Sequence, residues 1–185
     1  VANQTAQRLD PLAQKKKVQI EVTDNDEPVI AFVDVGQLQQ VLTNLIVNAI
    51  QSITSGGQVR IRMGHRFARP PEGHTGDADH YDFIDIEDNG EGIAEENLNH
   101  IFEPFFTTKE VGEGTGLGLS LSYGIIDEHG GWLEASSQVD KGTCFTVYLP
   151  REERNECSEK SLFFDTKRAC ANCWKRMSDW GNSNE

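Results

Sequence analysis

The chain has 185 residues, of which 37% are hydrophobic and 25% charged, and its formal net charge is −13. This length suits one domain with a real hydrophobic core and room for a tail. The acidic balance argues against nucleic acid or an anionic membrane as a partner, because both attract basic patches. No run of 18 or more apolar residues occurs, so we expect a soluble chain.

The charge is unevenly distributed along the chain. Residues 1–150 contain 10 Lys and Arg against 23 Asp and Glu, whereas residues 151–185 contain seven of each. This shift predicts a domain boundary near Pro150, followed by a weakly helical or disordered tail. Three cysteines lie in the tail, one fewer than the four ligands that zinc usually takes, so we expect free thiols in a reducing compartment. They are Cys157, Cys170 and Cys173.

The N-terminal segment is mostly polar. Leu9 and Leu12 indicate the end of a helix that lacks packing partners, and we interpret residues 1–17 as the remnant of a linker. Residues 18–22 then alternate between apolar and polar side chains, as a β-strand does. After an acidic turn, residues 29–33 are typical of a second strand, which predicts a β-hairpin.

The strongest helical pattern begins at Asp34, a good N-cap, and ends near Ile53. Apolar residues recur along it at the spacing of one buried helix face. A stripe of amides lies beside that face, within an arc of about 80°. Polar groups so placed cost free energy without partners, so we expect them to face a ligand or an ion, with ordinary surface amides as the alternative. The amides are Gln40, Asn44, Asn48 and Gln51.

Alternating patterns predict strands at residues 58–67 and 81–87. The second strand runs into Asp88-Asn89-Gly90-Glu91-Gly92-Ile93, which places a carboxylate at a strand end but is also a common turn sequence. A short helix at 94–101, a helix from Leu117 to His129, and strands at 132–136 and 143–149 complete the pattern.

Glycines alternate with other residues at the start of the last predicted helix, in the sequence Gly114-Thr115-Gly116-Leu117-Gly118-Leu119. Glycines at a helix N-terminus let backbone amides approach an anion, which predicts a phosphate-binding segment. The spacing fits neither the dinucleotide fingerprint nor the P-loop, and a glycine-rich helix cap is the alternative. Lys109 is the only Lys or Arg between Arg69 and Lys141, amid 17 Asp and Glu, so it is the natural phosphate contact.

Four sequence blocks in a fixed order resemble the ATP-binding domain of sensor histidine kinases: QVLTNLIVNA (40–49), DNGEGI (88–93), FEPFFTTK (102–109) and GTGLGLS (114–120). They are similar to the N, G1, F and G2 boxes of that family, which belongs to the GHKL or HATPase superfamily with its Bergerat fold. The FEPFFTTK and HGG segments are most similar to the nitrogen-regulation type.

The resemblance covers residues 18–150. It implies an α/β (α+β) two-layer sandwich, in which a mixed, mainly antiparallel sheet of about five strands is covered on one face by three helices. It also implies a mobile ATP lid.

The ligands that the resemblance implies are ATP and Mg²⁺. Asp88 would accept a hydrogen bond from the adenine amino group, Asn48 would bind Mg²⁺, and Lys109 would meet the γ-phosphate. Thr143 would lie near the base. The other implied nucleotide-binding positions are Asn44, Gln51, Gly90, Gly92, Ile93, Gly114, Thr115, Gly116, Leu117, Gly118 and Leu119.

Asn44 bears on the type of reaction. Related ATPases of this superfamily carry a water-activating glutamate at the equivalent position, one helical turn before the Mg²⁺-binding asparagine. An amide cannot act as a general base, so we expect phosphoryl transfer rather than hydrolysis, with Asn44 and Lys109 as the catalytic residues. Gln51 departs from kinases that carry a phosphate-binding lysine there, which leaves the phosphate contacts less well defined.

A histidine kinase also needs a phosphoacceptor histidine on a helical dimerisation domain. His65 and Pro70 imitate the usual spacing, but Arg66 replaces the expected acid and the segment is strand-like. We therefore expect a monomeric catalytic fragment of a cytoplasmic, homodimeric kinase that acts on a response regulator, with the histidine-containing dimerisation domain outside this chain. Whether the parent kinase is membrane-anchored stays open. The alternatives are a nucleotide-dependent switch or binding module and an ATPase of the wider superfamily.

Overall fold

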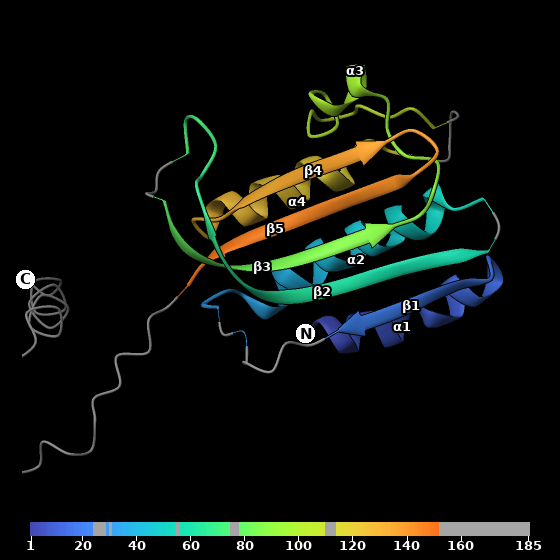
Figure 1. Ribbon diagram of the computed structural model, residues 1–185, viewed down its shortest axis with the longest axis horizontal. Coiled ribbons are helices and arrows are strands. Elements are labelled where there is room, and N and C mark those ends of the chain that lie inside the picture. Colours follow the sequence, from blue (N-terminus) through green and yellow to red (C-terminus); the bar gives the residue numbers. More distant parts are fainter. Residues whose placement is uncertain (24–28, 30, 55, 75–77, 110–113, 152–185) are drawn as a thin grey trace, which may run out of the picture. The chain divides into compact units, whose positions relative to one another are not determined.

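Five strands form one sheet in the computed structural model of the chain (Figure 1). Their order across the sheet is β1-β2-β3-β5-β4. β1 runs parallel to β2 and the other neighbours are antiparallel, so the predicted mixed, mainly antiparallel sheet is confirmed. The strands are β1 (Val18–Thr23), β2 (Gly57–Ala68), β3 (Asp79–Asp88), β4 (Trp132–Gln138) and β5 (Gly142–Pro150).

The structure describes residues 1–23, 29, 31–54, 56–74, 78–109 and 114–151. They belong to one compact unit, Val1–Glu152. No helix within these ranges is long and apolar enough to cross a membrane. The predictions for the C-terminal tail and for Cys157, Cys170 and Cys173 lie outside the described residues.

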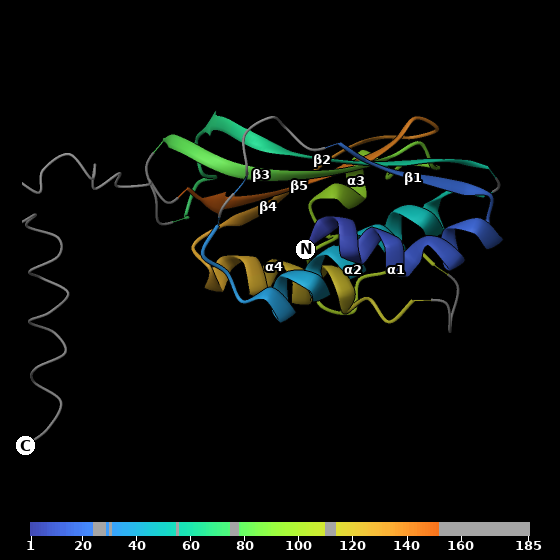
Figure 2. The ribbon, with the colours of Figure 1, turned by 90° about the horizontal axis from the view of Figure 1, so that it is seen from below.

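Helices cover one face of the sheet and form the second layer of the sandwich (Figure 2). They are α1 (Ala2–Lys15), α2 (Val35–Ser52) and α4 (Gly118–Glu128). A single turn, α3 (Glu95–Leu98), replaces the longer helix predicted at residues 94–101. The predicted two-layer architecture is therefore confirmed, although α1 is one of the three covering helices instead of the 94–101 segment.

Helix α2 has well-defined caps at both ends. Asp34 is its N-cap, and the side-chain Oδ1 accepts a hydrogen bond from the Gln37 amide at 2.8 Å. At the other end, Lys16 Nζ donates to the carbonyl oxygens of Gln51 at 3.0 Å and Ile53 at 3.2 Å. A cation at a helix C-terminus also complements the helix dipole. The buried face of α2 consists of Leu38, Val41, Leu42, Leu45, Ile46, Ala49 and Ile50.

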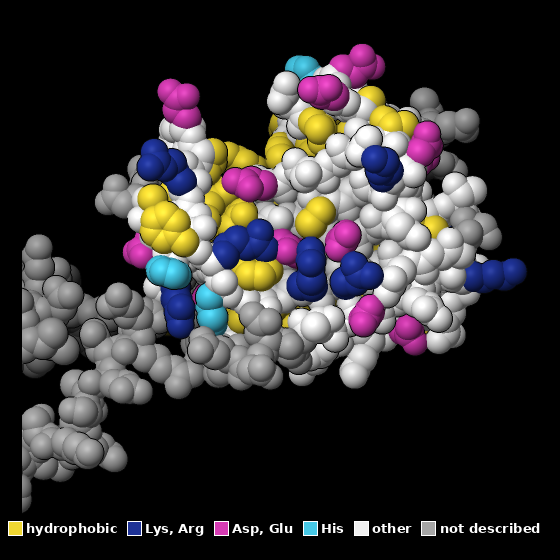
Figure 3. Space-filling view, in the orientation of Figure 1, with side chains coloured by type: hydrophobic (Ala, Val, Ile, Leu, Met, Phe, Trp, Pro, Cys, Tyr) yellow, Lys and Arg dark blue, Asp and Glu magenta, His cyan; other side chains and the backbone are white. Residues whose placement is uncertain are grey.

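The sheet follows the two-residue alternation of its sequence. On β2, Val59 and Ile61 point toward the helices and are fully buried. On the outer face, to which Figure 3 gives a view, Arg66 pairs with Asp85 at 2.7 Å and Arg60 with Glu87 at 3.3 Å. These two arginines of β2 are thus paired with carboxylates of β3.

The predicted N-terminal hairpin is wrong. Strand β1 pairs in parallel with β2, from Val18 opposite Gly57 to Thr23 opposite Arg62, and α2 makes the crossover. Residues 29 and 31–33 form no strand. Ala31 and Val33 nevertheless pack against the core. Their apolar alternation therefore reflects this packing and does not require hydrogen bonds to a neighbouring strand.

The prediction that the first helix lacks packing partners is also wrong. Helix α1 packs on β1 and α2. Ala2, Ala6 and Ala13 are buried in the core, and Leu9 packs against it. Small side chains let a helix approach a sheet closely. Because alanines are only weakly hydrophobic, the buried face of α1 was not recognised in the sequence. The origin of residues 1–17 in a linker stays a prediction.

Candidate functional site

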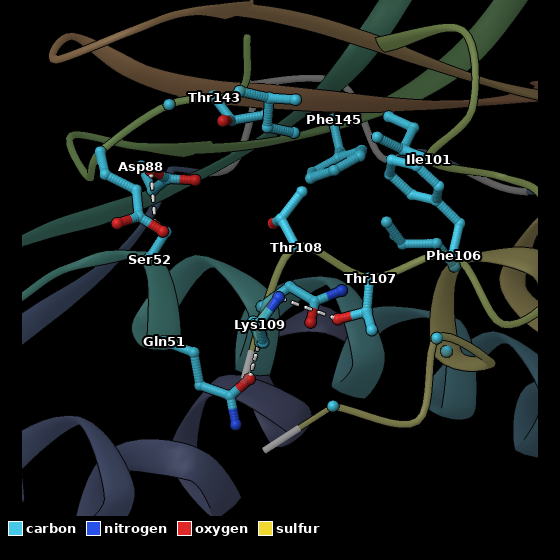
Figure 4. A pocket seen from close by; sticks show the side chains of 18 of the residues that line it. Gln51, Ser52, Asp88, Ile101, Phe106, Thr107, Thr108, Lys109, Thr143 and Phe145 are labelled. Carbon is cyan, nitrogen blue, oxygen red and sulfur yellow. Dashed lines mark hydrogen bonds between the residues drawn. The ribbon is translucent and has the colours of Figure 1, made fainter. Parts of the chain in front are cut away.

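A cavity of about 350 Å³ opens on the inner face of the sheet, where β3 ends and β5 begins (Figure 4). Asp88 comes from the end of β3, and Thr143 and Phe145 come from β5. The C-terminal half of α2 forms another wall. Residues from the segments 106–109 and 114–119 close the remaining sides. The cavity therefore joins parts of the chain that are far apart in sequence.

Asp88 is a buried carboxylate at one end of this cavity, with 4% of its surface exposed. Its Oδ1 accepts hydrogen bonds from the Gly90 amide at 2.8 Å and from Ser52 Oγ at 2.9 Å. Desolvation by burial raises the pKa of Asp88, although these hydrogen bonds lower it. A carboxylate has about four acceptor sites, so Asp88 keeps capacity for a ligand donor.

Across the cavity from Asp88 the wall is apolar. Figure 4 places Ile101 and Phe106 on the far side, with Phe145 between them and Thr143. Ligand sites are commonly apolar clefts in which a few polar groups fix the orientation of the ligand. The space between Asp88 and this apolar wall suits a flat, largely apolar group that carries a hydrogen-bond donor for Asp88.

Gly92 gives the turn after β3 its shape. Its φ of +72° lies in the left-handed region, and a Cβ there would collide with the carbonyl oxygen of Gln138. The turn is tied to the β4–β5 connection, since the Asp140 amide donates to the Glu91 carbonyl oxygen at 2.8 Å. Glycine at this position is therefore required by both backbone conformation and space.

Gly116 plays the same part in the glycine-rich segment. Its φ is +64°, and a Cβ would collide with the backbone of Phe105. The Phe105 amide donates to the Gly116 carbonyl oxygen at 2.9 Å. Phe105 itself has a left-handed φ of +68° and an exposed side chain. These contacts join the FEPFFTTK and GTGLGLS blocks directly.

Lys109 brings a positive charge to the α2 side of the cavity. Its Nζ donates to Gln51 Oε1 at 2.5 Å, and its backbone amide donates to Thr107 Oγ1 at 3.2 Å. Figure 4 shows Lys109 and Gln51 together on the α2 side. The cavity thus combines a buried acceptor, a cation and a glycine-rich helix start in its lining.

The cavity brings together predicted residues from all four sequence blocks. Gly90 and Leu117 are outside its lining, although the Gly90 amide holds Asp88 in place. The predicted residues that line it are Asn48, Gln51, Asp88, Gly92, Ile93, Lys109, Gly114, Thr115, Gly116, Gly118, Leu119 and Thr143.

Asn44 is also outside the cavity lining. Its Nδ2 donates to the Gly118 carbonyl oxygen and to Ser122 Oγ, each at 3.2 Å. The side chain therefore links α2 to the first turn of α4. Gln40, the preceding amide of the predicted stripe, is exposed. This agrees with the alternative that such amides are ordinary surface residues.

Several residues of the site were not predicted. Ser52 lies four residues after Asn48 on the same stripe of α2, so helical spacing could have identified it. Phe106 and Phe145 carry only an apolar signal in the sequence, which does not distinguish a cavity wall from the core. Ile101 is likewise part of the core and of the cavity wall.

A two-layer fold whose cavity is lined by a buried acceptor, a cation and a glycine-rich helix start is typical of a nucleotide-binding domain. Residues 33–153 match the family described as histidine kinase-, DNA gyrase B-, and HSP90-like ATPase. The chain belongs to this family, and the predicted ATP-binding catalytic domain of the sensor histidine kinase type is confirmed. The closer likeness to the nitrogen-regulation type stays a prediction.

Curated relatives include sensor kinases. Sensor kinase CckA of Brucella abortus (strain 2308) is 48% identical over 121 residues, which cover 64% of this chain and 13% of that protein. Sensor histidine kinase ZraS of Escherichia coli (strain K12) is 36% identical over 148 residues, which cover 80% of this chain and 29% of that protein. The chain thus spans less than a third of these relatives.

Solved structures agree with this assignment. The nucleotide-free catalytic domain of histidine kinase ThkA superposes with a TM-score of 0.66 at 28% identity, covering 81% of this chain and 91% of that chain. The full-length ShkA structure in complex with AMPPNP has the same TM-score of 0.66 at 24% identity, covering 81% of this chain and 29% of that chain, and it supports the fold alone.

Proposed function

We propose that the chain binds Mg-ATP in the described cavity and transfers the γ-phosphate to a histidine on a separate dimerisation domain, for relay to a response regulator. The observation that carries this proposal is that one cavity is lined by the buried acceptor Asp88, by the cation of Lys109 and by the glycine-rich start of α4. A single ligand with a base at one end and phosphates at the other fits both groups.

The adenine ring occupies the end near Asp88. The carboxylate accepts a hydrogen bond from the exocyclic amino group, and Ser52 and the Gly90 amide hold the carboxylate in position. Ile93, Phe145 and the other apolar side chains of the wall cover the ring. Removal of these apolar surfaces from water adds to the binding free energy.

The phosphates occupy the end near α4. The helix is 11 residues long, and its glycine-rich start presents backbone amides where the helix dipole favours an anion. Lys109 supplies a cation beside it, which contacts the γ-phosphate. One of its partners, the Gln51 amide oxygen, is uncharged, and a phosphate oxygen of higher charge is a stronger partner for the ammonium group.

Asn48 is the residue that fits a Mg²⁺ ligand. Mg²⁺ is usually held by one or two protein oxygens together with substrate phosphates and waters. Asn48 lines the cavity next to Gln51 on α2, and its amide oxygen is a suitable hard ligand. The described part of the chain contains no cluster of three His, Cys, Asp or Glu side chains that could hold the ion without nucleotide. When bound, the ion neutralises phosphate charge.

Transfer rather than hydrolysis is favoured by Asn44. An amide cannot deprotonate water, and its Nδ2 is engaged by α4. We propose that Asn44 acts in the reaction by positioning the glycine-rich start of α4. Phosphoryl transfer depends mainly on positioning and electrostatic stabilisation, which these groups supply.

The acceptor histidine lies on another domain. His65 is on the inner face of β2, its side chain is 12% exposed, and its Nδ1 hydrogen-bonds to Asp82. Apolar side chains are instead exposed beside the phosphate end, on Phe105, Leu117, Leu121 and Tyr123. A helical partner that covers these side chains would bring its histidine near the γ-phosphate.

The test uses the full chain, γ-labelled ATP, Mg²⁺ and a separately produced histidine-bearing helical domain of the parent kinase. The proposal predicts label on a histidine of that domain, and much less label with Lys109→Met. No phosphohistidine at any Mg²⁺ concentration would exclude the transfer. Steady ATP hydrolysis by the chain alone would favour the ATPase alternative, and nucleotide binding without either reaction would favour a switch.

A further inference from the structure

Three polar side chains lie in a row on the inner face of the sheet beside the cavity. Ser137 on β4 is paired in register with Thr143 on β5, and Asp88 follows Glu87, which pairs with Cys144. The Thr143 backbone also hydrogen-bonds to the Asp88 carboxylate. Ser137 is the member of this row that does not line the cavity.

The Ser137 hydroxyl has three polar neighbours. It accepts a hydrogen bond from the Ile93 amide at 2.8 Å. Its Oγ lies 2.9 Å from the Gly142 carbonyl oxygen and 2.9 Å from Thr143 Oγ1. These distances are all within the range of good hydrogen bonds.

Proton counting decides the direction of each bond. A hydroxyl has one proton and can accept two hydrogen bonds, whereas a carbonyl oxygen can only accept. The proton of Ser137 therefore points to the Gly142 oxygen, because no other arrangement avoids an unfavourable contact between two oxygens. The remaining contact is satisfied only when Thr143 donates to Ser137. Thr143 thus uses its only hydroxyl proton inside the protein.

The cavity consequently presents acceptors at its polar end. Thr143 Oγ1 has lone pairs but no free proton, and Asp88 is a carboxylate whose Oδ1 already accepts from Gly90 and Ser52. A ligand amino group finds partners at such a surface. A ligand carbonyl oxygen is itself an acceptor and finds no hydrogen-bond donor at this surface. Burying acceptors without a donor weakens binding.

We infer that Ser137 is a specificity-determining positioning residue, which fixes the Thr143 hydroxyl as an acceptor and so favours 6-aminopurine over 6-oxopurine nucleotides. The inference rests on the proposed nucleotide site and adds a residue that acts on the ligand through another side chain. Ser137 also holds the Ile93 amide, so its loss affects the shape of the turn as well as the polarity of Thr143. A change in the shape of the turn weakens binding of ATP and ITP alike, whereas a change in the polarity of Thr143 alters the preference between them.

The test measures dissociation constants of ATP and ITP for the full chain by competition with a fluorescent nucleotide. ITP carries a carbonyl oxygen where ATP carries the amino group. Ser137→Ala is expected to lower the preference for ATP over ITP by about three- to tenfold, the range of one hydrogen bond. Ser137→Thr keeps a hydroxyl and is expected to keep the preference, and Ser136→Ala is the exposed neighbour that serves as a matched control.

Thr143→Val completes a double-mutant cycle. This variant should lower the preference by itself, and Ser137→Ala should then change the preference no further. Equal weakening of ATP and ITP by Ser137→Ala, or independent effects of the two substitutions on the preference, would overturn the inference and leave a purely structural role. A wild-type chain that binds no ATP would overturn the proposed function and this inference together.

Discussion

Lys109 and Gln51 connect the FEPFFTTK block to the last turn of α2, with Lys109 Nζ donating to Gln51 Oε1 at 2.5 Å. The bond joins a cation to a neutral amide, and both side chains line the cavity. An anionic phosphate oxygen is a stronger partner for an ammonium group than an amide oxygen. Nucleotide binding is therefore expected to move Lys109 from Gln51 to the γ-phosphate.

Lys109→Met should weaken binding of ATP more than binding of ADP. The lost charge-assisted hydrogen bond is worth about 1.5–3 kcal/mol, which corresponds to a tenfold or greater loss of ATP affinity. Titration calorimetry with both nucleotides measures the difference. Lys141→Met, at the β4–β5 turn, changes the net charge equally and should leave both affinities unaltered. Equal losses for ATP and ADP with Lys109→Met would contradict the γ-phosphate contact.

Asp88→Asn should raise the free energy of unfolding at pH 7. Burial raises the pKa of Asp88 above its ordinary value of 3.8, so the folded state pays a cost once the carboxyl ionises. This cost appears as the pH rises above 3.8 and is fully present above the folded-state pKa. The Asn side chain removes the charge while its oxygen still accepts from the Gly90 amide.

Urea unfolding between pH 4 and pH 8 measures this effect. The stability difference between Asp88→Asn and the wild type should shrink as the pH falls toward 3.8, the ordinary pKa of the carboxyl. Asp79→Asn, at the exposed start of β3, provides a control for the removal of one negative charge. A variant that is less stable than the wild type at pH 7 would contradict the account.

Asn44→Ala should destabilise the fold through the contact between α2 and α4. The substitution removes the hydrogen bonds from Asn44 Nδ2 to the Gly118 oxygen and Ser122 Oγ, although the Gly118 oxygen still accepts from the Ser122 hydroxyl at 2.8 Å. We expect a loss of about 1–2 kcal/mol in the free energy of unfolding, measured by urea titration. Gln40→Ala removes an exposed amide one turn earlier and should have little effect. Equal stability of the two variants would show that the Asn44 link contributes nothing.

Much of the fold could be predicted from the sequence because its strongest signals are local. The apolar periodicity and the Asp34 cap predicted α2, and local strand patterns predicted β2, β3, β4 and β5 to within a few residues. The pairing of β1 could not be predicted in this way, since an alternating segment has the same pattern whether its partner is adjacent or follows a crossover helix. The burial of α1 likewise depends on its neighbours.

The site also combines residues with a local sequence signal and residues whose role depends on the tertiary fold. Asp88, Asn48 and Lys109 were predicted because they lie in sequence blocks whose order is distinctive. Ser137 was not predicted, since its role depends on its register opposite Thr143 and on the turn that places the Ile93 amide. Cross-strand relations of this kind are fixed by the tertiary fold and leave no local spacing in the sequence.

The most direct test of the central claim is a calorimetric titration of the full chain with ATP, in the presence and absence of Mg²⁺. The account predicts saturable binding of one ATP per chain, tighter with Mg²⁺, and at least about tenfold weaker for Asp88→Asn because a buried charged hydrogen bond is lost. Unchanged ATP affinity of Asp88→Asn, or no ATP binding by the wild type at millimolar nucleotide, would contradict it.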